Sequence, residues 1–163
     1  MYEYRTLEQV SPVILYETFR TAYEGIPSIG GKSFRAFAQV LQNCGYLGEG
    51  SMGAFDKKTG RMVAFVLNSI YIYGGSSAAY NIMTGTLPGH RRKGLAKNLL
   101  NKCESLLRDH EVTMYTTEAL QNNEPAVSLF LSRGFKVIGE LSTPVTDDTG
   151  SHEINQYTMQ LEL

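Results

Sequence analysis

The chain has 163 residues, of which 42% are hydrophobic and 10% aromatic. A chain of this length can fill one well-packed core but not two, so we predict a single domain spanning residues 1–163. Fifteen basic and sixteen acidic residues leave a net charge of -1, which argues against broad nucleic-acid binding and favours a small ligand.

Neither the cysteines nor the histidines are spaced like metal ligands or a redox motif. Cys44 and Cys103 lie far apart, and the three histidines stand in different contexts. No apolar run approaches the roughly 18 residues of a membrane-spanning helix, and the polar start lacks the apolar segment of a signal peptide. We therefore expect a cytoplasmic protein with no metal site and no membrane partner, and a homodimer stays open.

The start of the chain predicts a strand followed by a helix. Residues 1–7 alternate weakly, which favours a strand. Ser11 and Pro12 then offer a cap and a first-turn proline for a helix that ends at residues 25–27. The expected inner face of this helix comprises Val13, Ile14, Tyr16, Phe19, Arg20 and Tyr23.

A glycine-rich turn over residues 23–32 separates this helix from a second one. The second helix is expected to stop near Gly45, and its apolar positions are Phe34, Phe37, Ala38, Leu41 and Gln42. The two helices should form a hairpin.

An antiparallel meander is predicted next. Residues 51–55 and 61–68 are strand-like and are separated by a polar turn that ends in glycine, which indicates a β-hairpin. The second run can continue through residues 70–73, and residues 78–85 supply the following strand.

A basic, glycine-bounded loop follows that strand. Pro88 stops the strand, and Gly89 and Gly94 allow backbone angles that side chains disfavour. After Gly94 apolar residues recur at steps of three and four, which predicts a helix from about Gly94 to near Asp109. Its apolar stripe contains Leu95, Leu99, Cys103 and Leu106, widened by Ala96, Leu100 and Leu107. Its polar face contains Lys97, Asn101, Lys102, Glu104 and Arg108.

The start of this helix is typical of an anion site. Its first N–H groups lack partners within the helix, its dipole is positive there, and three cations precede it, namely Arg91, Arg92 and Lys93. A P-loop would need lysine and serine or threonine after the second glycine, where this chain has Leu95 and Ala96. We expect a ligand that carries a diphosphate.

A strand over residues 112–117 follows the helix, so strand, helix and strand form a crossover with the two strands parallel. Ligands bind at the carboxyl ends of the strands in such a unit. The next helix has Asn122 or Asn123 as cap, Pro125 in its first turn and Gly134 at its end. Residues 136–141 and 156–163 then predict two closing strands joined by a loop.

Two segments carry a family resemblance. Residues 91–96 read Arg-x-x-Gly-x-Ala, which resembles the coenzyme A pyrophosphate loop of the GNAT (GCN5-related) N-acetyltransferases, whose signature is Arg/Gln-x-x-Gly-x-Gly/Ala. Residues 123–135 resemble that family's other hallmark, Asn-x-x-Ala-x-x-Leu-Tyr-x-x-x-Gly-Phe, with Phe130 in place of the tyrosine. Both motifs stand in the family's order and spacing, so the chain is similar to the GNAT family over about residues 82–135.

The expected fold is α+β, with a mixed, mostly antiparallel sheet and helices on both faces, which is similar to the GNAT fold. The resemblance implies acetyl-CoA as co-substrate, and two central parallel strands that splay so that the first can bond the pantetheine arm. A glycine-rich turn such as residues 23–32 can be only a surface connection, but the resemblance implies that it grips the acceptor. The residues it assigns to the cofactor are Met83, Thr84, Gly85, Thr86, Arg91, Arg92, Lys93, Gly94, Leu95, Ala96 and Asn123.

The implied reaction moves an acetyl group from acetyl-CoA to a primary amine of a small molecule or peptide. This transfer needs a neutral amine and a way for the thiolate to leave, and most of the help can be positional. Glu118, directly after the predicted strand, is the candidate general base, although it could equally be a solvated residue that starts a loop. Glu24 and Glu49 are further candidates.

Phe130 occupies the position of the tyrosine that protonates the departing sulfur in many relatives. Because it has no proton to donate, three explanations stay open: the thiolate leaves unaided, another hydroxyl or water serves, or catalysis has been lost. The last would make the protein a coenzyme A-binding sensor or regulatory module. A fold-only interaction protein is a third class, and a binding assay distinguishes it.

Overall fold

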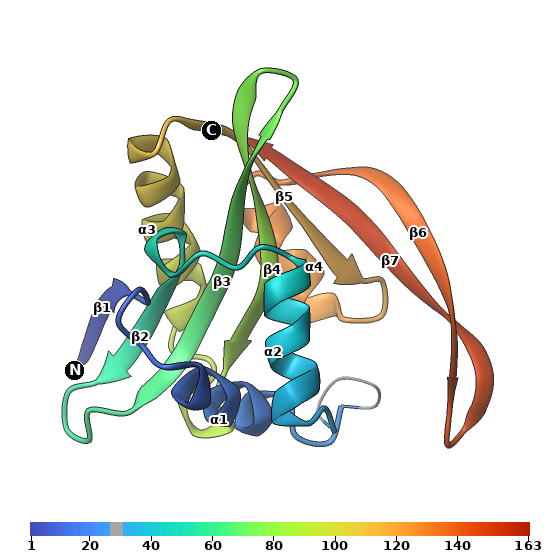
Figure 1. Cartoon of the computed structure of the whole chain (residues 1–163), viewed down its shortest axis with the longest axis horizontal. Helices are drawn as coiled ribbons and strands as arrows, with labels where there is room; N and C mark the ends of the chain where they lie inside the picture. Colours follow the sequence, from blue (N-terminus) through green and yellow to red (C-terminus); the bar gives the residue numbers. More distant parts are fainter. Residues whose placement is uncertain (27–30) are drawn as a thin grey trace.

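The computed structural model describes residues 1–26 and 31–163, without the side chain of Asp147. In this part of the chain seven strands form one sheet in the order β1-β2-β3-β4-β5-β7-β6, and only β4 and β5 are parallel (Figure 1). The strands are β1 (Tyr2–Thr6), β2 (Met52–Asp56), β3 (Met62–Tyr73), β4 (Ser76–Thr86), β5 (Val112–Leu120), β6 (Lys136–Asp147) and β7 (Gly150–Glu162).

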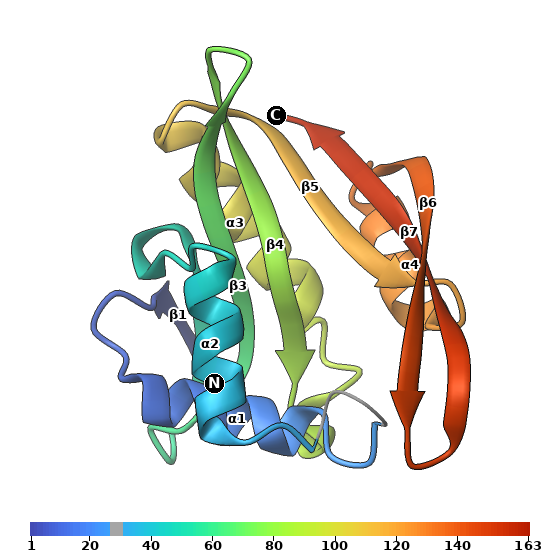
Figure 2. The ribbon, with the colours of Figure 1, turned by 45° about the vertical axis from the view of Figure 1, so that its right-hand side comes forward.

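Helices cover both faces of the sheet. The helix pair α1 and α2 lies on one face, and α3 and α4 lie on the other (Figures 1 and 2). Their bounds, with those of two short 3-10 turns, are α1 (Pro12–Ala22), α2 (Phe34–Asn43), η1 (Gly48–Gly50), η2 (Pro88–His90), α3 (Leu95–Asp109) and α4 (Glu124–Ser132). The predicted α+β fold with a mixed, mostly antiparallel sheet is confirmed.

Local signals explain where the helices begin. The Ser11 hydroxyl accepts a hydrogen bond from the Ile14 amide, and the Asn123 side chain accepts one from the Ala126 amide, as predicted caps should. Gly134 ends α4 with a φ of +92°, a conformation that glycine adopts without strain.

The predicted inner face of α1 is wrong in part. Val13 and Ile14 are 52% and 45% exposed, whereas the buried residues are Leu15, Thr18, Phe19 and Ala22. These four positions follow the spacing i, i+3, i+4 and i+7, so they form one stripe that rotates Val13 and Ile14 toward solvent. Phe19 in turn stacks on Phe37 of α2, with ring centroids 4.7 Å apart.

Glu104 was predicted to lie on the polar face of α3, and this prediction is wrong. Its side chain is buried and accepts a 2.9 Å hydrogen bond from Nε of Arg133, the residue that follows α4. This charge-assisted bond explains how a carboxylate can lie inside the α3–α4 layer.

The loop predicted between the closing strands is also wrong, because β6 and β7 continue as a long hairpin. Their pairing runs from Lys136↔Gln160 to Asp147↔Gly150. Pro144 is compatible with this pairing because β6 is the edge strand of the sheet. In the described part of the chain, no helix combines the length and the apolar character that crossing a membrane requires.

Candidate active site

The two parallel strands separate toward their carboxyl ends (Figure 2). β4 and β5 are paired from Ser77↔Val112 to Asn81↔Thr117. Beyond that point the end of β4 pairs only with β3, and residues 118–120 of β5 pair only with β7. The two facing edges therefore have no ladder partner, and the edge of β4 is formed by Ile82, Met83, Thr84, Gly85 and Thr86.

The end of β4 is held firmly by its surroundings. Opposite β3, the register shifts so that Ile82 forms a bulge between Asn81 and Met83. The hydroxyl of Tyr23, at the end of α1, donates a 2.6 Å hydrogen bond to the Thr84 carbonyl. Gly85 leaves room for the ring of Phe65, since a Cβ there would lie 2.6 Å from Phe65 Cζ.

The loop after β4 leads into a helix start without a side-chain cap. Arg92 and Gly94 both have positive φ, +60° and +74°, and Gly94 is the cap residue of α3. In α1, α2 and α4 the cap side chain accepts a hydrogen bond from a helix amide, whereas Gly94 has no side chain to do so. The first N–H groups of α3 stay available to an anion.

The three loop cations, Arg91, Arg92 and Lys93, differ in their contacts. Arg91 donates to the Thr86 carbonyl at 3.2 Å and to the Ala22 carbonyl at 2.8 Å, so it ties the end of β4 to the end of α1. Arg92 and Lys93 are exposed and form no ion pair with described residues. They remain free to face a charged ligand.

Glu118 lies within β5 and not after it. The predicted strand end at residue 117 is wrong because β7 pairs with β5 up to Leu120, with Glu118 opposite Thr158. Along β5, Tyr115 points to the α4 side, where it contacts Phe135, so the alternation of a strand turns Glu118 to the α1–α2 side. It is half-buried there, at the point where β4 and β5 have separated.

Tyr80 and Cys44 lie near Glu118 on that face, close enough for its charge to act on both. Burial raises the pKa of Tyr80 well above its ordinary value, and the charge of Glu118 together with a hydrogen bond to it raises that pKa further. Burial also raises the pKa of Cys44, which follows α2, and the charge of Glu118 adds to this shift. Tyr80 and Cys44 are therefore protonated near neutral pH, and Tyr80 can donate to the carboxylate.

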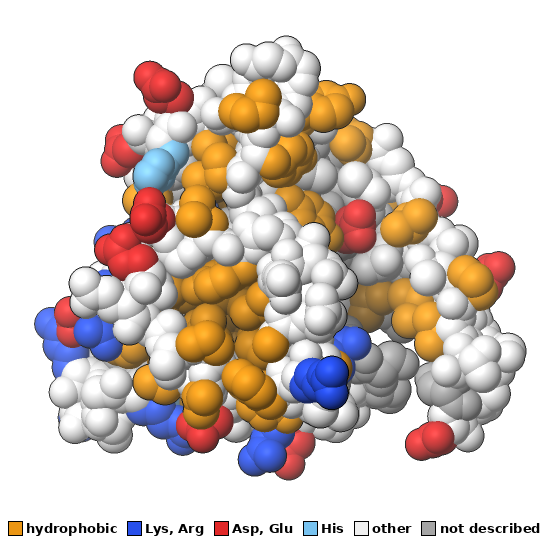
Figure 3. All heavy atoms as spheres, viewed as in Figure 1, with side chains coloured by type: hydrophobic (Ala, Val, Ile, Leu, Met, Phe, Trp, Pro, Cys, Tyr) orange, Lys and Arg blue, Asp and Glu red, His pale blue; other side chains and the backbone are white. Residues whose placement is uncertain are grey.

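The molecular surface is hollowed between α2 and the β6–β7 hairpin (Figure 3). The split between β4 and β5 opens in the same region (Figure 1). The unpaired strand edge and Glu118 lie at this split.

The sequence also matches a known family over most of its length. The model of the acetyltransferase (GNAT) family matches residues 14–135. The chain belongs to the GNAT acetyltransferase family. As a member of this family it is an acetyltransferase, with acetyl-CoA as its co-substrate.

Solved structures of GNAT enzymes have the same fold. The ribosomal-protein-S18-alanine N-acetyltransferase from Escherichia coli is 22% identical with a TM-score of 0.77, over 99% of this chain and 94% of that one. The ribosomal-protein-alanine N-acetyltransferase from Brucella melitensis is 19% identical with a TM-score of 0.73, over 99% of both. Arabidopsis thaliana NAA60 in complex with acetyl-CoA is 17% identical with a TM-score of 0.75, over 100% of both. No curated protein matches this sequence.

Phe130 belongs to the core of this GNAT chain. It is buried, and its ring meets that of Phe135 edge-on with centroids 5.2 Å apart, while Phe135 also contacts Tyr115. The phenyl ring therefore fills space beneath β5 and supplies no proton. Asn123 caps α4 by accepting a hydrogen bond from the Ala126 amide, so its side-chain oxygen already has a partner.

The other predicted acid-base candidates lie in different places. Glu24 is exposed and follows Tyr23, which contacts the edge of β4. Glu49 lies in η1, where the Gly48 carbonyl accepts a hydrogen bond from the Leu7 amide next to β1, so the structure does not bring it to the split. Of the turn over residues 23–32, residues 27–30 lie outside the described part of the chain.

Tyr80, Tyr23 and Cys44 lie at the site but are not among the site residues predicted from the sequence. Tyr80 had a signal, because it stands on a predicted strand that leads into the basic loop. Tyr23 and Cys44 had none, since each reaches the site only through the packing of α1 and α2.

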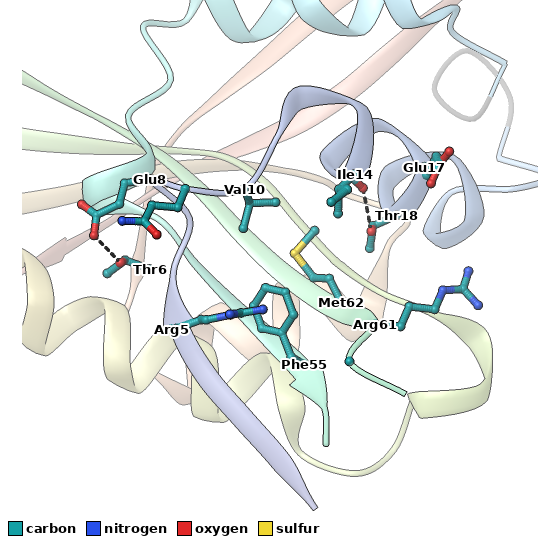
Figure 4. Close-up of a pocket in the computed structure, with 12 residues that line it drawn as sticks. Arg5, Thr6, Glu8, Val10, Ile14, Glu17, Thr18, Phe55, Arg61 and Met62 are labelled. Atoms are coloured by element: carbon teal, nitrogen blue, oxygen red, sulfur yellow. Dashed lines mark hydrogen bonds between the residues drawn. The ribbon is translucent and has the colours of Figure 1, made fainter. Parts of the chain in front are cut away.

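A separate cavity lies between α1 and the strands β1 and β2 (Figure 4). Its volume is about 560 Å³, and it shares no residue with the split. Arg5 covers the Phe55 ring at 3.8 Å there, and Glu8 and Glu17 lie on the same rim. Charges of both signs line this cavity, so its lining does not favour a ligand of either charge. We assign the cavity no part in the reaction.

Proposed function

We propose that this GNAT enzyme transfers an acetyl group from acetyl-CoA to a primary amine of a small molecule or peptide, with Glu118 as general base. The observation that carries the proposal is the position of Glu118 at the β4–β5 split, beside Tyr80. A peptide amine is our first choice of acceptor. Support comes from the names of two similar structures, which are N-acetyltransferases of ribosomal-protein alanine.

The cofactor-binding residues divide into an edge and a cradle. The unpaired edge from Ile82 to Thr86 offers backbone groups to the pantetheine arm, as a neighbouring strand would. The start of α3, with Arg92 and Lys93, offers N–H groups and charge to the diphosphate. Arg91 contributes by holding the edge and the end of α1 together.

Bound acetyl-CoA supplies the acetyl thioester. Glu118 accepts a proton from the acceptor amine, directly or through water, so that nitrogen can form its bond to the acetyl carbon while the carbon–sulfur bond breaks. The hydroxyl of Tyr80, which lies beside Glu118, can donate to the carboxylate and orient it. Because Phe130 has no acidic proton, the released thiolate takes its proton from water.

Thiol release with a panel of amines tests the proposal. Peptides with free N-termini, amino acids and polyamines are offered together with acetyl-CoA. We expect turnover with at least one class and an acetylated amine in the mass spectrum of the product. Coenzyme A binding without turnover on any amine would instead favour the sensor or regulatory module, for which Phe130 is the supporting residue.

A further inference from the structure

A network of buried polar side chains lies where β4 and β5 separate. The Asn81 side chain donates to Thr84 Oγ1 at 2.9 Å and to the Tyr115 hydroxyl at 3.1 Å. The side-chain oxygen of Asn81 accepts from the Thr84 hydroxyl at 3.2 Å and from the Thr117 hydroxyl at 3.4 Å. Asn81, Tyr115 and Thr117 are only 3%, 0% and 1% exposed. One amide therefore links the two strands from within the core.

The network continues away from the split into β3. The Tyr115 hydroxyl donates to Asn68 Oδ1 at 2.6 Å, and Asn68 Nδ2 donates to the Gly50 carbonyl at 2.8 Å. Every side-chain amide and hydroxyl in this run has a partner. Such a network is favourable only when it is complete, since a buried polar group without a partner is costly.

The position of Asn81 relates the network to the split. Asn81↔Thr117 is the last pair between the parallel strands, and the bulge at Ile82 begins at the next residue. Thr84, which lies beyond the bulge, is held by the Asn81 side chain and not by β5. The amide thus bonds across the point where the backbone ladder ends.

We propose that Asn81, supported by Tyr115 and Thr117, is a positioning residue that sets where β4 leaves β5 and so aligns the edge that receives the pantetheine arm. The role in cofactor binding rests on the proposed function. The role in fixing the strand edge is a property of the free protein. The two parts can therefore be tested separately.

The variants are Asn81→Leu, Tyr115→Phe and Thr117→Val, with Thr18→Val as control. Neither Tyr115 nor Thr117 is accessible to a ligand, so any effect on binding must act through the residues they contact, and both bond Asn81. Thr18 is matched to Thr117, because it is also buried and its hydroxyl donates to the Ile14 carbonyl at 2.9 Å within α1. Coenzyme A affinity is measured by calorimetry, and amide hydrogen exchange is measured in the free protein.

We expect coenzyme A to bind about tenfold more weakly to Tyr115→Phe and Thr117→Val, with a larger loss in Asn81→Leu, and exchange of the amides from Ile82 to Thr86 to become about tenfold faster. Thr18→Val should lower the melting temperature by a similar amount to Thr117→Val and leave both readouts unchanged. Affinity and exchange equal to wild type in Tyr115→Phe and Thr117→Val would overturn the inference. So would equal losses in Thr18→Val.

The milder variants keep the test valid if Asn81→Leu does not fold. Wild-type protein that binds no coenzyme A would refute the proposed function alone, and the exchange measurement would still decide whether Asn81 holds the edge of β4.

Discussion

At the scale of single residues, Tyr46 and Tyr23 show that the contribution of a buried hydroxyl to stability depends on whether it has a hydrogen-bond partner. Burial raises the pKa of both to about 12. The Tyr23 hydroxyl donates to the Thr84 carbonyl, whereas the buried Tyr46 hydroxyl has no hydrogen-bond partner among the described residues. A buried hydroxyl without a partner keeps its desolvation cost and gains nothing in return.

We therefore predict opposite effects of removing the two hydroxyls. Tyr46→Phe should leave the free energy of unfolding unchanged or raise it by up to about 1 kcal/mol, and Tyr23→Phe should lower it by about 1 kcal/mol. Urea unfolding at neutral pH measures both. A marked loss of stability in Tyr46→Phe would show that its hydroxyl has a partner after all.

The raised pKa of Tyr46 also predicts how its variant responds to alkali. The folded protein holds the tyrosine proton more tightly than the unfolded chain, whose pKa is near the ordinary value of 10.0. This contribution is complete below pH 10 and is lost as the pH rises toward 12. Tyr46→Phe should thus lose less stability than wild type between pH 10 and 12, as measured by unfolding in buffers across that range.

Glu118 supports a third prediction at this scale. Glu118→Gln should lower kcat by at least about a hundredfold and flatten its rise with pH, because the amide cannot accept the amine proton. Tyr80→Phe should lower kcat less, since it removes only a donor to the carboxylate. Steady-state kinetics with the best amine of the panel, together with coenzyme A binding as control, measure this. Full activity of Glu118→Gln with the same pH profile would exclude it as the base.

At the scale of elements, the start of α3 combines a backbone requirement with a binding role. Gly94 has a φ of +74°, and nothing lies within 4 Å of where its Cβ would be. Gly60, in the turn between β2 and β3, has a φ of +72° and the same open surroundings. The two glycines therefore face the same strain on substitution but differ in their distance from the cradle.

A matched pair of variants uses this similarity. Gly94→Ala and Gly60→Ala should each lower the free energy of unfolding by about 1–2 kcal/mol, the cost of a left-handed conformation with a side chain. Only Gly94→Ala should raise the KM for acetyl-CoA, and it should do so far more than it lowers kcat at saturation. Equal KM values in the two variants would place the diphosphate elsewhere.

At the scale of the whole molecule, ligand binding should appear as a gain in thermal stability. A ligand held only by the native state stabilises it by roughly 2.7 kcal/mol at a hundredfold excess over Kd, which for a chain of this size is a shift of roughly 5–10 °C in Tm. Coenzyme A should give this shift, and pantetheine, which lacks the diphosphate, much less. ATP carries more phosphate charge but cannot occupy the strand edge, so it should also lag behind. Equal shifts from ATP and coenzyme A would reduce the site to a basic loop.

Much of the fold could be read from short-range signals in the sequence. Ser11, Asn123, Gly94 and Gly134 each act on backbone groups within a few residues, so their effects on helix ends are visible locally. The crossover and its parallel strands follow from the order of elements and the handedness of such units. The basic loop and the start of α3 could be predicted for the same reason, since they are contiguous.

The remaining features depend on the folded chain, because ladder partners and side-chain contacts come from distant parts of the sequence. Glu118 belongs to a strand because Thr158 of β7 pairs with it, and nothing near residue 118 specifies that partner. The bond between Asn81 and Tyr115 joins residues 34 positions apart. Local sequence signals thus account for most of the elements and for the basic loop before α3, whereas packing places Glu118 beside Tyr80 and fixes the point at which the strands separate.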